Sequence, residues 1–285
     1  MLKWIMQVLT NKIVISLTTV PERLSYDVED GFKSVLKSIC NQNYDNYEVH
    51  LNLPEIYKVT GEHYIIPEWL DELQKEHPHL KIYRVEDMGP PTKVIPTILR
   101  ESDETLLIVV DDDLIYHEDM ILEHIKYHME LPNSVILYDG RSLMGSKYGD
   151  LRDSWVICVT KPTRIRGMLQ HYKSVSYHKK YFQEDFFQDF LGKTKSDDIL
   201  MTYYFLHKKI KMYVVPYEKD VEKIQTYDEW YNFQGVTTFP VLRHSNSLGN
   251  TGCNHPKILE LETKFFIPDE FKRIDTEIID WYGIL

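Results

Sequence analysis

Short apolar runs alternate with segments of helical periodicity through the first half of the chain, and this alternation constrains the fold more than any other feature. Between the apolar runs, hydrophobic residues recur every three or four positions, which indicates helices packed on one face. An alternating order of strands and helices predicts an α/β fold in which helices flank a mostly parallel central sheet. The predicted strands are Ile13–Leu17, Tyr47–Leu51, Leu80–Val85, Thr105–Val110 and Ser134–Tyr138.

Helices are predicted between and after these strands, although the second half of the chain is less regular. Pro67 marks one helix start, because proline suits the first helical turn. The other helices are predicted over 28–39, Lys93–Arg100, His117–Glu130, Tyr181–Phe190 and Asp197–Lys208, with a further strand over Lys211–Val215.

The overall charge of the chain restricts its partners. Its 285 residues include 33 Lys and Arg against 44 Asp and Glu, a formal net charge of −11. This acidic excess argues against a nucleic-acid binder, because phosphate backbones require clustered Lys and Arg. It is compatible with a small phosphorylated ligand that arrives with a metal ion.

The cysteines and the apolar segments bear on the cellular compartment. Cys40, Cys158 and Cys253 lie far apart and form no zinc motif or disulfide framework, so we interpret them as reduced core thiols. No apolar run reaches the ~18 residues of a membrane span, and the first residues lack the pattern of a signal peptide. The sequence therefore predicts a cytoplasmic protein without a membrane span.

Three adjacent carboxylates, Asp111-Asp112-Asp113, directly follow the most apolar predicted strand. They repel one another unless a cation lies among them. Such oxygen ligands suit Mg²⁺ or Mn²⁺, which commonly share their coordination shell with substrate phosphates. In an extended segment Asp111 and Asp113 point the same way, so both are candidates for one metal ion. The alternative is a solvated acidic turn.

A second acidic pair, Asp197-Asp198, follows Ser196 at the start of a predicted helix. Ser196 is a typical helix N-cap, and acidic residues in a first turn interact favourably with the helix dipole. The alternative to this structural role is catalytic, because a carboxylate at the rim of a metal site can accept the proton of an attacking hydroxyl. Asp198 and Asp197 are therefore candidate general bases.

Two turns follow other predicted strands, at the edge where parallel sheets bind ligands. The turn Asp87–Lys93 contains Gly89, which gives the backbone freedom, and ends at Lys93, whose ammonium group can reach a phosphate. The turn Thr18–Arg23 follows the first strand, where a nucleotide would be met. Each turn taken singly is ordinary.

Taken in order, these segments resemble those of glycosyltransferases with the Rossmann-like GT-A fold. Ile13–Arg23 resembles their first strand and nucleotide-binding loop, and Asp87–Lys93 resembles the Asp-x-Gly-Pro-x-Thr-Lys segment of a group of bacterial, viral and eukaryotic glycosyltransferase-like proteins. Val109–Tyr116 resembles the DxD segment, and Ser196–Leu200 the downstream Asp-Asp or Glu-Asp segment. The last two segments are also similar to those of exostosin-like transferases.

The resemblance implies one GT-A domain over residues 1–285. Residues 12–113 would bind the nucleotide sugar, 114–220 would carry the acceptor and catalytic groups, and 221–285 would form an irregular C-terminal loop and helical segment. The implied enzyme is metal-dependent and transfers a sugar, a hexose or a pentose such as xylose, from a UDP-sugar to a hydroxyl of a glycan. If the chain is viral, the compartment would be the host cytoplasm.

The resemblance also implies roles for individual residues. Mn²⁺ or Mg²⁺ would bind Asp113 and Asp111, with His244 as a further ligand from the C-terminal region. Asp198, or Asp197, would be the general base of an inverting enzyme, whereas in a retaining, exostosin-like enzyme these acids would hold hydroxyl groups. The UDP-sugar would contact Thr18, Pro21, Arg23, Asp87, Lys93, Asp111 and Asp112.

Two other classes of protein share part of this pattern. An apolar strand followed by Asp-x-Asp also occurs in haloacid-dehalogenase-type phosphatases, but here Leu114-Ile115 follows in place of the pattern of that class. A degenerate transferase fold could instead serve as a non-catalytic glycan-binding module. A transferase would slowly hydrolyse a nucleotide sugar with Mn²⁺, a phosphatase would release inorganic phosphate, and a binding module would do neither.

Overall fold

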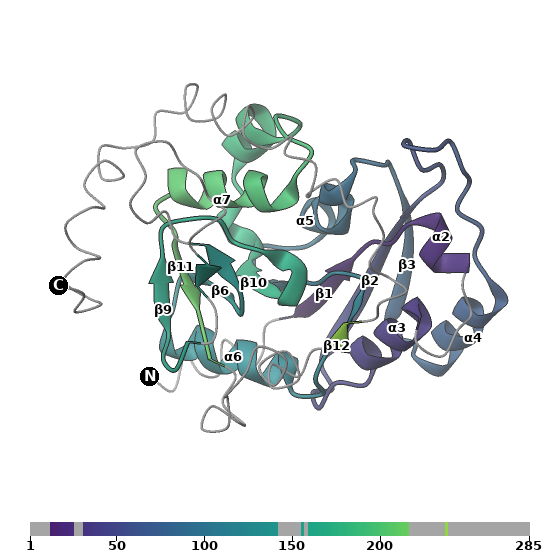
Figure 1. Ribbon diagram of the computed structural model, residues 1–285, viewed down its shortest axis with the longest axis horizontal. Helices are drawn as coiled ribbons and strands as arrows, with labels where there is room; N and C mark the ends of the chain where they lie inside the picture. Colours follow the sequence, from purple (N-terminus) through teal and green to yellow (C-terminus); the bar gives the residue numbers. More distant parts are fainter. Residues whose placement is uncertain (1–11, 26–30, 142–154, 157–158, 217–236, 239–285) are drawn as a thin grey trace.

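An eight-stranded sheet forms the centre of the computed structural model (Figure 1), which describes residues 12–25, 31–141, 155–156, 159–216 and 237–238. The strand order is β3-β2-β1-β4-β10-β6-β11-β9. Only β10 and β9 run against the other strands of this sheet. The strands are β1 (Ile13–Leu17), β2 (Tyr47–Pro54), β3 (Leu80–Val85), β4 (Leu106–Val109), β6 (Ser134–Leu137), β9 (Thr163–Ile165), β10 (Val175–His178) and β11 (Lys211–Val214).

Helices cover both faces of the sheet, with α5 and α7 on one side and α3, α4 and α6 on the other (Figure 1). The predicted α/β architecture with a mostly parallel sheet is therefore confirmed. Within the described ranges, no helix combines the length and apolar character that a membrane crossing requires. The helices are α2 (Pro21–Ser25), α3 (Phe32–Cys40), α4 (Glu68–Glu76), α5 (Ile95–Arg100), α6 (Met120–Glu130) and α7 (Asp197–His207).

Short turns and two small sheets complete the described elements. The 3₁₀ turns are η1 (Pro90–Lys93), η2 (His171–Lys173) and η3 (Lys179–Tyr181), and η4 (Phe186–Phe190) is a π-helical turn. The small sheets pair β5 (Leu114–Ile115) with β12 (Thr237–Thr238), and β7 (Gly140–Arg141) with β8 (Trp155–Val156).

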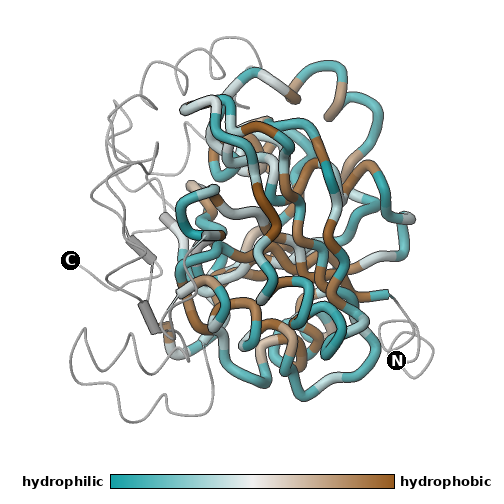
Figure 2. The backbone as a smooth tube through the Cα atoms, turned by 90° about the vertical axis from the view of Figure 1, so that its right-hand side faces the viewer, coloured by the Kyte–Doolittle hydropathy of each residue, from teal (hydrophilic) through white to brown (hydrophobic). Residues whose placement is uncertain are grey.

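Strand β1 shows how the sequence produces two cores. Ile13, Ile15 and Leu17 face a core shared with α3, α4 and α6, whereas Val14 faces a second core shared with α5 and α7. All these side chains are fully buried, which explains why the strand reads as a continuous apolar run. In Figure 2, hydrophobic segments are concentrated inside and hydrophilic turns lie outside.

Strand β10 was not predicted, although it lies between β4 and β6 in the middle of the sheet. Its sequence, Val-Ser-Tyr-His, has too little apolar character to indicate a buried strand. The buried Ser176 hydroxyl is hydrogen-bonded to His128 Nε2 and to His124 Nδ1, both at 2.8 Å. Helix α6 thus supplies the partners that make a polar central strand possible.

The helical segment predicted over Tyr181–Phe190 is confirmed only in part, because it contains the end of η3 and the π-helical turn η4 and no continuous α-helix. Its aromatic rings pack on Tyr204 of α7, and these contacts take precedence over helical propensity. The ring centroids of Phe182, Phe186 and Phe190 lie 5.5, 4.8 and 5.2 Å from that of Tyr204. Other predictions needed smaller corrections. The strand that begins at Tyr47 continues to Pro54, residues 93–100 divide into η1 and α5, and the helix over His117–Glu130 begins at Met120.

Candidate active site

A cleft of about 250 Å³ opens at the carboxyl ends of β1, β2, β3 and β4. Parallel sheets bind ligands at this edge, because the strand ends leave a crevice there. Three of the predicted segments line the cleft: Thr18–Arg23, Asp87–Lys93 and Asp111–Asp113. The connection after β2 supplies the remaining wall, through Pro54, Tyr57, Val59, Thr60, Glu62 and Tyr64.

The turn after β1 is fixed by hydrogen bonds from two directions. The Thr18 hydroxyl donates to the carbonyl of Asn52 at 2.7 Å, and the Tyr64 hydroxyl donates to the carbonyl of Thr19 at 2.9 Å. Pro21 then begins helix α2, which carries Arg23 toward the acidic cluster. These contacts place the turn at the cleft wall.

Asp87 shapes the turn after β3. Its carboxylate accepts the backbone N–H of Lys58 at 2.7 Å and that of Gly89 at 2.8 Å. Gly89 has a φ of 72°, a left-handed conformation that favours glycine. The hydroxyl of Thr92 accepts the Met88 N–H at 2.8 Å, which closes the turn before η1.

Lys93 occupies the centre of the site. Its carbonyl accepts the hydroxyl of Ser16 at 2.5 Å and the side-chain amide of Asn52 at 3.3 Å. Its Nζ forms ion pairs with Asp111 and, at 2.9 Å, with Asp197. Burial alone would lower the pKa of Lys93, but the two carboxylates outweigh it and raise the pKa well above its ordinary value. The ammonium group is therefore charged and shared by two acidic segments.

The three carboxylates of the Asp111–Asp113 segment have different partners. Asp112 accepts the Thr19 hydroxyl at 2.5 Å and is paired with Arg23. Asp111 is paired with Lys93, as described above. Among the residues that the structure describes, Asp113 has only a 3.6 Å ion pair with Arg23, and its Oδ1 is buried without a hydrogen-bond partner.

These partners leave Asp113 as the position where a cation would be stabilising. Burial, together with the negative charges of Asp111 and Asp112, raises the pKa of Asp113 to about 7. A buried carboxylate oxygen without a partner is costly, and a divalent cation would supply that partner. The residues of this segment thus fit the Mg²⁺ or Mn²⁺ ion that the sequence predicts.

The second acidic pair begins helix α7 and is organised by a residue that the sequence did not reveal. Ser196 caps the helix by accepting the Ile199 N–H at 3.4 Å. The buried Nδ1 of His171 lies 2.9 Å from Asp197 Oδ2 and 2.8 Å from Asp198 Oδ1. The backbone N–H of His171 also donates to Asp198 Oδ1, at 3.0 Å.

Protonation states follow from this arrangement. Burial alone would lower the pKa of His171, but the hydrogen bonds to Asp197 and Asp198 raise it to about 9. Burial would raise the pKa of Asp197, but Lys93 and His171 outweigh it and hold that pKa far below its usual range. The pKa of Asp198 is raised, by burial and then by Asp197. The pair therefore combines one firmly ionised carboxylate with one of higher basicity.

The structure brings most of the predicted residues together. Asp197 and Asp198 do not line the cleft, but Lys93 connects them to it. His244 lies outside the described residues. The residues that the sequence did not reveal are Ser16, Asn52, Tyr64 and His171.

No known protein family matches the chain, and no curated protein sequence does. Several solved structures resemble it at low sequence identity. TarS from S. aureus (residues 1–349, in complex with UDP) is 15% identical, with 70% of this chain and 57% of that chain covered and a TM-score of 0.43. The 4-diphosphocytidyl-2C-methyl-D-erythritol synthase from Anaerococcus prevotii is 12% identical. The match covers 79% of this chain and 94% of that chain, with a TM-score of 0.48.

A third structure is the mannosyltransferase PcManGT from Pyrobaculum calidifontis, in complex with GDP-Man and Mn²⁺. It is 13% identical, with 46% of this chain and 35% of that chain covered and a TM-score of 0.33. The chain thus spans little more than half of the TarS fragment and about a third of the mannosyltransferase.

Proposed function

We propose that this chain is a metal-dependent glycosyltransferase of the GT-A type, which transfers a sugar from a UDP-sugar to a hydroxyl of a glycan acceptor. The observation that carries the proposal is the position of Lys93. Its Nζ contacts Asp111, in the segment suited to a cation, and Asp197, beside the candidate base. A donor site and a catalytic carboxylate are needed within one reaction centre, and Lys93 connects the two.

The donor half of the proposal rests on the cleft. Two aromatic residues, Tyr57 and Tyr64, are among the residues that line the cleft, where a nucleotide base would have apolar contact. Asp113 and Asp111 would hold Mn²⁺ or Mg²⁺, with His244 as a further candidate ligand. When bound, the metal ion neutralises charge on the departing nucleoside diphosphate. Arg23 holds Asp112 and Asp113 in place for this role.

The catalytic half assigns Asp198 as the general base of an inverting transfer. The Asp198 side chain is 27% exposed, whereas that of Asp197 is only 7% exposed. Its Oδ1 is held by His171, so Oδ2 is the atom to accept the acceptor's proton. A raised pKa favours this function, because a base is effective when its pKa approaches the working pH. In a retaining transferase the same carboxylates would hold sugar hydroxyls.

The continuous sheet supports a proposal for the domain organisation. We propose one catalytic domain, in which residues 12–113 bind the donor and residues 114–220 carry the base and the acceptor site. The sheet crosses from one half to the other where β10 pairs with β4. Residues 221–285, the proposed C-terminal segment, lie outside the described part apart from β12.

The decisive experiment is calorimetric titration of UDP and UDP-sugars with and without Mn²⁺, on the wild-type chain and on Asp113→Ala. We expect Mn²⁺ to strengthen UDP binding at least tenfold in the wild type, and we expect this gain to vanish in the variant. Asp103→Ala is the matched control, because that side chain is 64% exposed and outside the cleft. Equal Mn²⁺-dependent affinity in Asp113→Ala would exclude the proposed metal site. Release of inorganic phosphate from sugar phosphates would instead support a phosphatase.

A further inference from the structure

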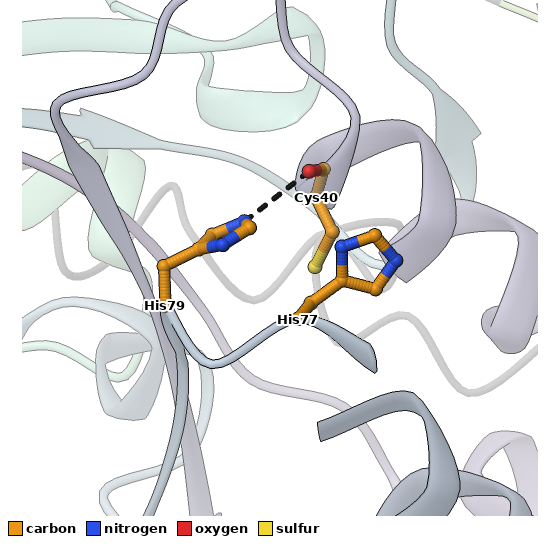
Figure 3. A group of neighbouring side chains, drawn as sticks. All are labelled: Cys40, His77 and His79. Atoms are coloured by element: carbon orange, nitrogen blue, oxygen red, sulfur yellow. Dashed lines mark hydrogen bonds between the residues drawn. The ribbon is translucent and has the colours of Figure 1, made fainter. Parts of the chain in front are cut away.

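A second group of metal-ligating side chains lies at the opposite end of the strands from the cleft. Cys40 is the last residue of α3, His77 follows the end of α4, and His79 directly precedes β3 (Figure 3). The cysteine sulfur and one nitrogen from each histidine all lie within 4.8 Å of one another. We propose that Cys40, His77 and His79 form a site for a borderline-soft transition-metal ion, Zn²⁺.

The side chains are already directed toward a common point. Figure 3 shows the sulfur of Cys40 between the two imidazole rings. The ring centroids of His77 and His79 are 5.6 Å apart, with the ring planes at 83°. Nearly perpendicular rings on either side of a sulfur allow one nitrogen of each ring to reach the same ion.

The hydrogen bonding of His79 leaves one nitrogen available. His79 Nε2 lies 3.2 Å from the carbonyl oxygen of Cys40. Because a carbonyl only accepts, Nε2 carries the proton in this contact, and Nδ1 of the neutral ring keeps its lone pair. A ligating histidine commonly has this second contact, since it fixes the tautomer and the orientation of the ring.

The backbone around the three residues is held in place by regular structure. The Tyr47 hydroxyl donates to the Cys40 carbonyl at 2.7 Å, and the Tyr47 ring lies 4.7 Å from that of His79. The His77 N–H donates to Leu73 of α4 at 2.9 Å, and the carbonyl of His79 accepts from Val49 of β2 at 2.9 Å. Metal binding therefore requires side-chain rotation and no rearrangement of the fold.

The donor set determines which ion fits. With Zn–S near 2.3 Å and Zn–N near 2.0 Å, neighbouring ligand atoms in a tetrahedral site are roughly 3.5 Å apart, so atoms that lie within 4.8 Å of one another have to close by at most about 1.3 Å. Only the thiolate is a ligand, so binding releases the thiol proton to solvent. Cys40 is 4% exposed, whereas both histidines are partly exposed and open a path for the ion. A water molecule would complete the tetrahedron.

This donor set contrasts with that of the cleft. Asp111 and Asp113 offer only carboxylate oxygens, which suit Mg²⁺ or Mn²⁺, whereas one thiolate and two imidazoles suit Zn²⁺. The site would join the ends of α3 and α4 to the start of β3, away from the catalytic groups. Its role would accordingly be to stabilise this part of the fold.

The test is titration of the reduced, metal-free full-length chain with Co²⁺ and Zn²⁺, followed by absorption spectroscopy and calorimetry. Co²⁺ bound to a thiolate gives a sulfur-to-metal charge-transfer band that carboxylate ligands do not give. We expect this band in the wild type, displaced by one equivalent of Zn²⁺. We expect His77→Ala to weaken Zn²⁺ binding about tenfold or more, since even the loss of a supporting contact costs that much.

Matched variants separate this site from the other metal-binding groups of the chain. His63→Ala removes an exposed histidine and should bind Zn²⁺ as the wild type does. Asp113→Ala should also retain the band, because the cleft is not involved. If Cys40→Ser destabilises the chain, the partly exposed His77 still provides the test. An undiminished band in His77→Ala, or loss of the band in Asp113→Ala, would overturn the proposal.

Discussion

The acidic segments Asp111–Asp113 and Asp197-Asp198 share the ammonium group of Lys93, yet their charges are balanced differently. In the first segment, the negative charges of three carboxylates are balanced by Arg23 and by Lys93, which the second segment shares. In the second, two carboxylates have a share of Lys93 and the protonated ring of His171. The first segment keeps an excess of negative charge, and the second is close to neutral.

The difference shows that the number of carboxylates alone does not identify a metal site. His171 Nδ1 lies 2.8 Å from Asp198 Oδ1 and 2.9 Å from Asp197 Oδ2. It therefore occupies the place that a metal ion bound to both carboxylates would take. In the first segment, Asp113 lies 3.6 Å from Arg23, and its Oδ1 is buried without a hydrogen-bond partner among the described residues. A metal ion is therefore expected at Asp113, whereas Asp198 is free to act as a base.

Replacement of Asp198, the proposed base, should give the largest effect on sugar transfer. A small effect would contradict the different roles assigned to the two acidic segments. We expect Asp198→Asn to reduce sugar transfer by about 10²–10⁴-fold, the usual contribution of a general base. Donor binding should be unchanged, because the cleft residues are untouched. Transfer rates and UDP affinity measure the two effects, with the exposed Asp189→Asn as control. Less than about a tenfold loss of rate would contradict the role of a base.

Removal of the shared cation should affect both segments at once. In Lys93→Met, the buried Asp197 and the partly exposed Asp111 each lose an ion-pair partner, so we expect a loss of about 3–5 kcal/mol in the free energy of unfolding. Urea denaturation measures the change. Lys179→Met is the control, since Lys179 pairs with the exposed Asp103 and should contribute only ~0–1 kcal/mol. Similar losses in both variants would mean that Lys93 does not hold the segments together.

The protonated state of His171 predicts a dependence of stability on pH. Its pKa is raised from an ordinary value of 6.5 to about 9, so its stabilisation is complete below pH 6.5 and lost as the pH rises through 9. We expect the free energy of unfolding to fall by on the order of 3 kcal/mol over this window, relative to His171→Gln. Denaturation at successive pH values measures the difference. If the free energy of unfolding of wild type and variant changed with pH in parallel, the His171 ring would be neutral. The second acidic segment, like the first, would then keep an excess of negative charge.

The smallest expected effect is on stability and comes from a change that touches only the Asp111–Asp113 segment. Thr19→Val keeps the shape of the side chain but removes the hydroxyl that donates to Asp112. We expect a loss of about 1–3 kcal/mol in stability, because the hydrogen bond is to a charged group. Thermal denaturation checks this, with Thr163→Val at the edge of the sheet as control. A change in the pH dependence attributed to His171 would argue against separate roles for the two segments.

The parts of the fold that were predictable from sequence are those in which one short segment carries a clear pattern. The strands Ile13–Leu17 and Leu80–Val85 were predicted at their observed limits, the first because a strand buried on both faces reads as an apolar run. Strand β10 was not predictable, since the histidines that satisfy Ser176 come from α6, about 50 residues earlier. Local pattern cannot reveal a partner supplied by tertiary structure.

The same distinction holds for the candidate site. The acidic segments stood out because adjacent carboxylates are unusual behind a buried strand or at a capped helix. His171 did not, because its sequence neighbourhood gives no sign of a contact 27 residues away with Asp198. The Cys40 group likewise depends on two helix ends and a strand start that only the fold brings together. The assigned catalytic and metal-binding roles themselves remain predictions.

Strand β10 also has a consequence for how the chain is synthesised. Strands β1 to β4 leave the ribosome as a complete parallel set, whereas β6 pairs with β10 and β11, both of which are made later. Until residues 175–178 emerge, β4 and β6 therefore both expose unpaired edges, which are the parts of a sheet most prone to association with other chains. Vectorial synthesis thus leaves an interval in which a chaperone that covers strand edges would have its largest effect on yield.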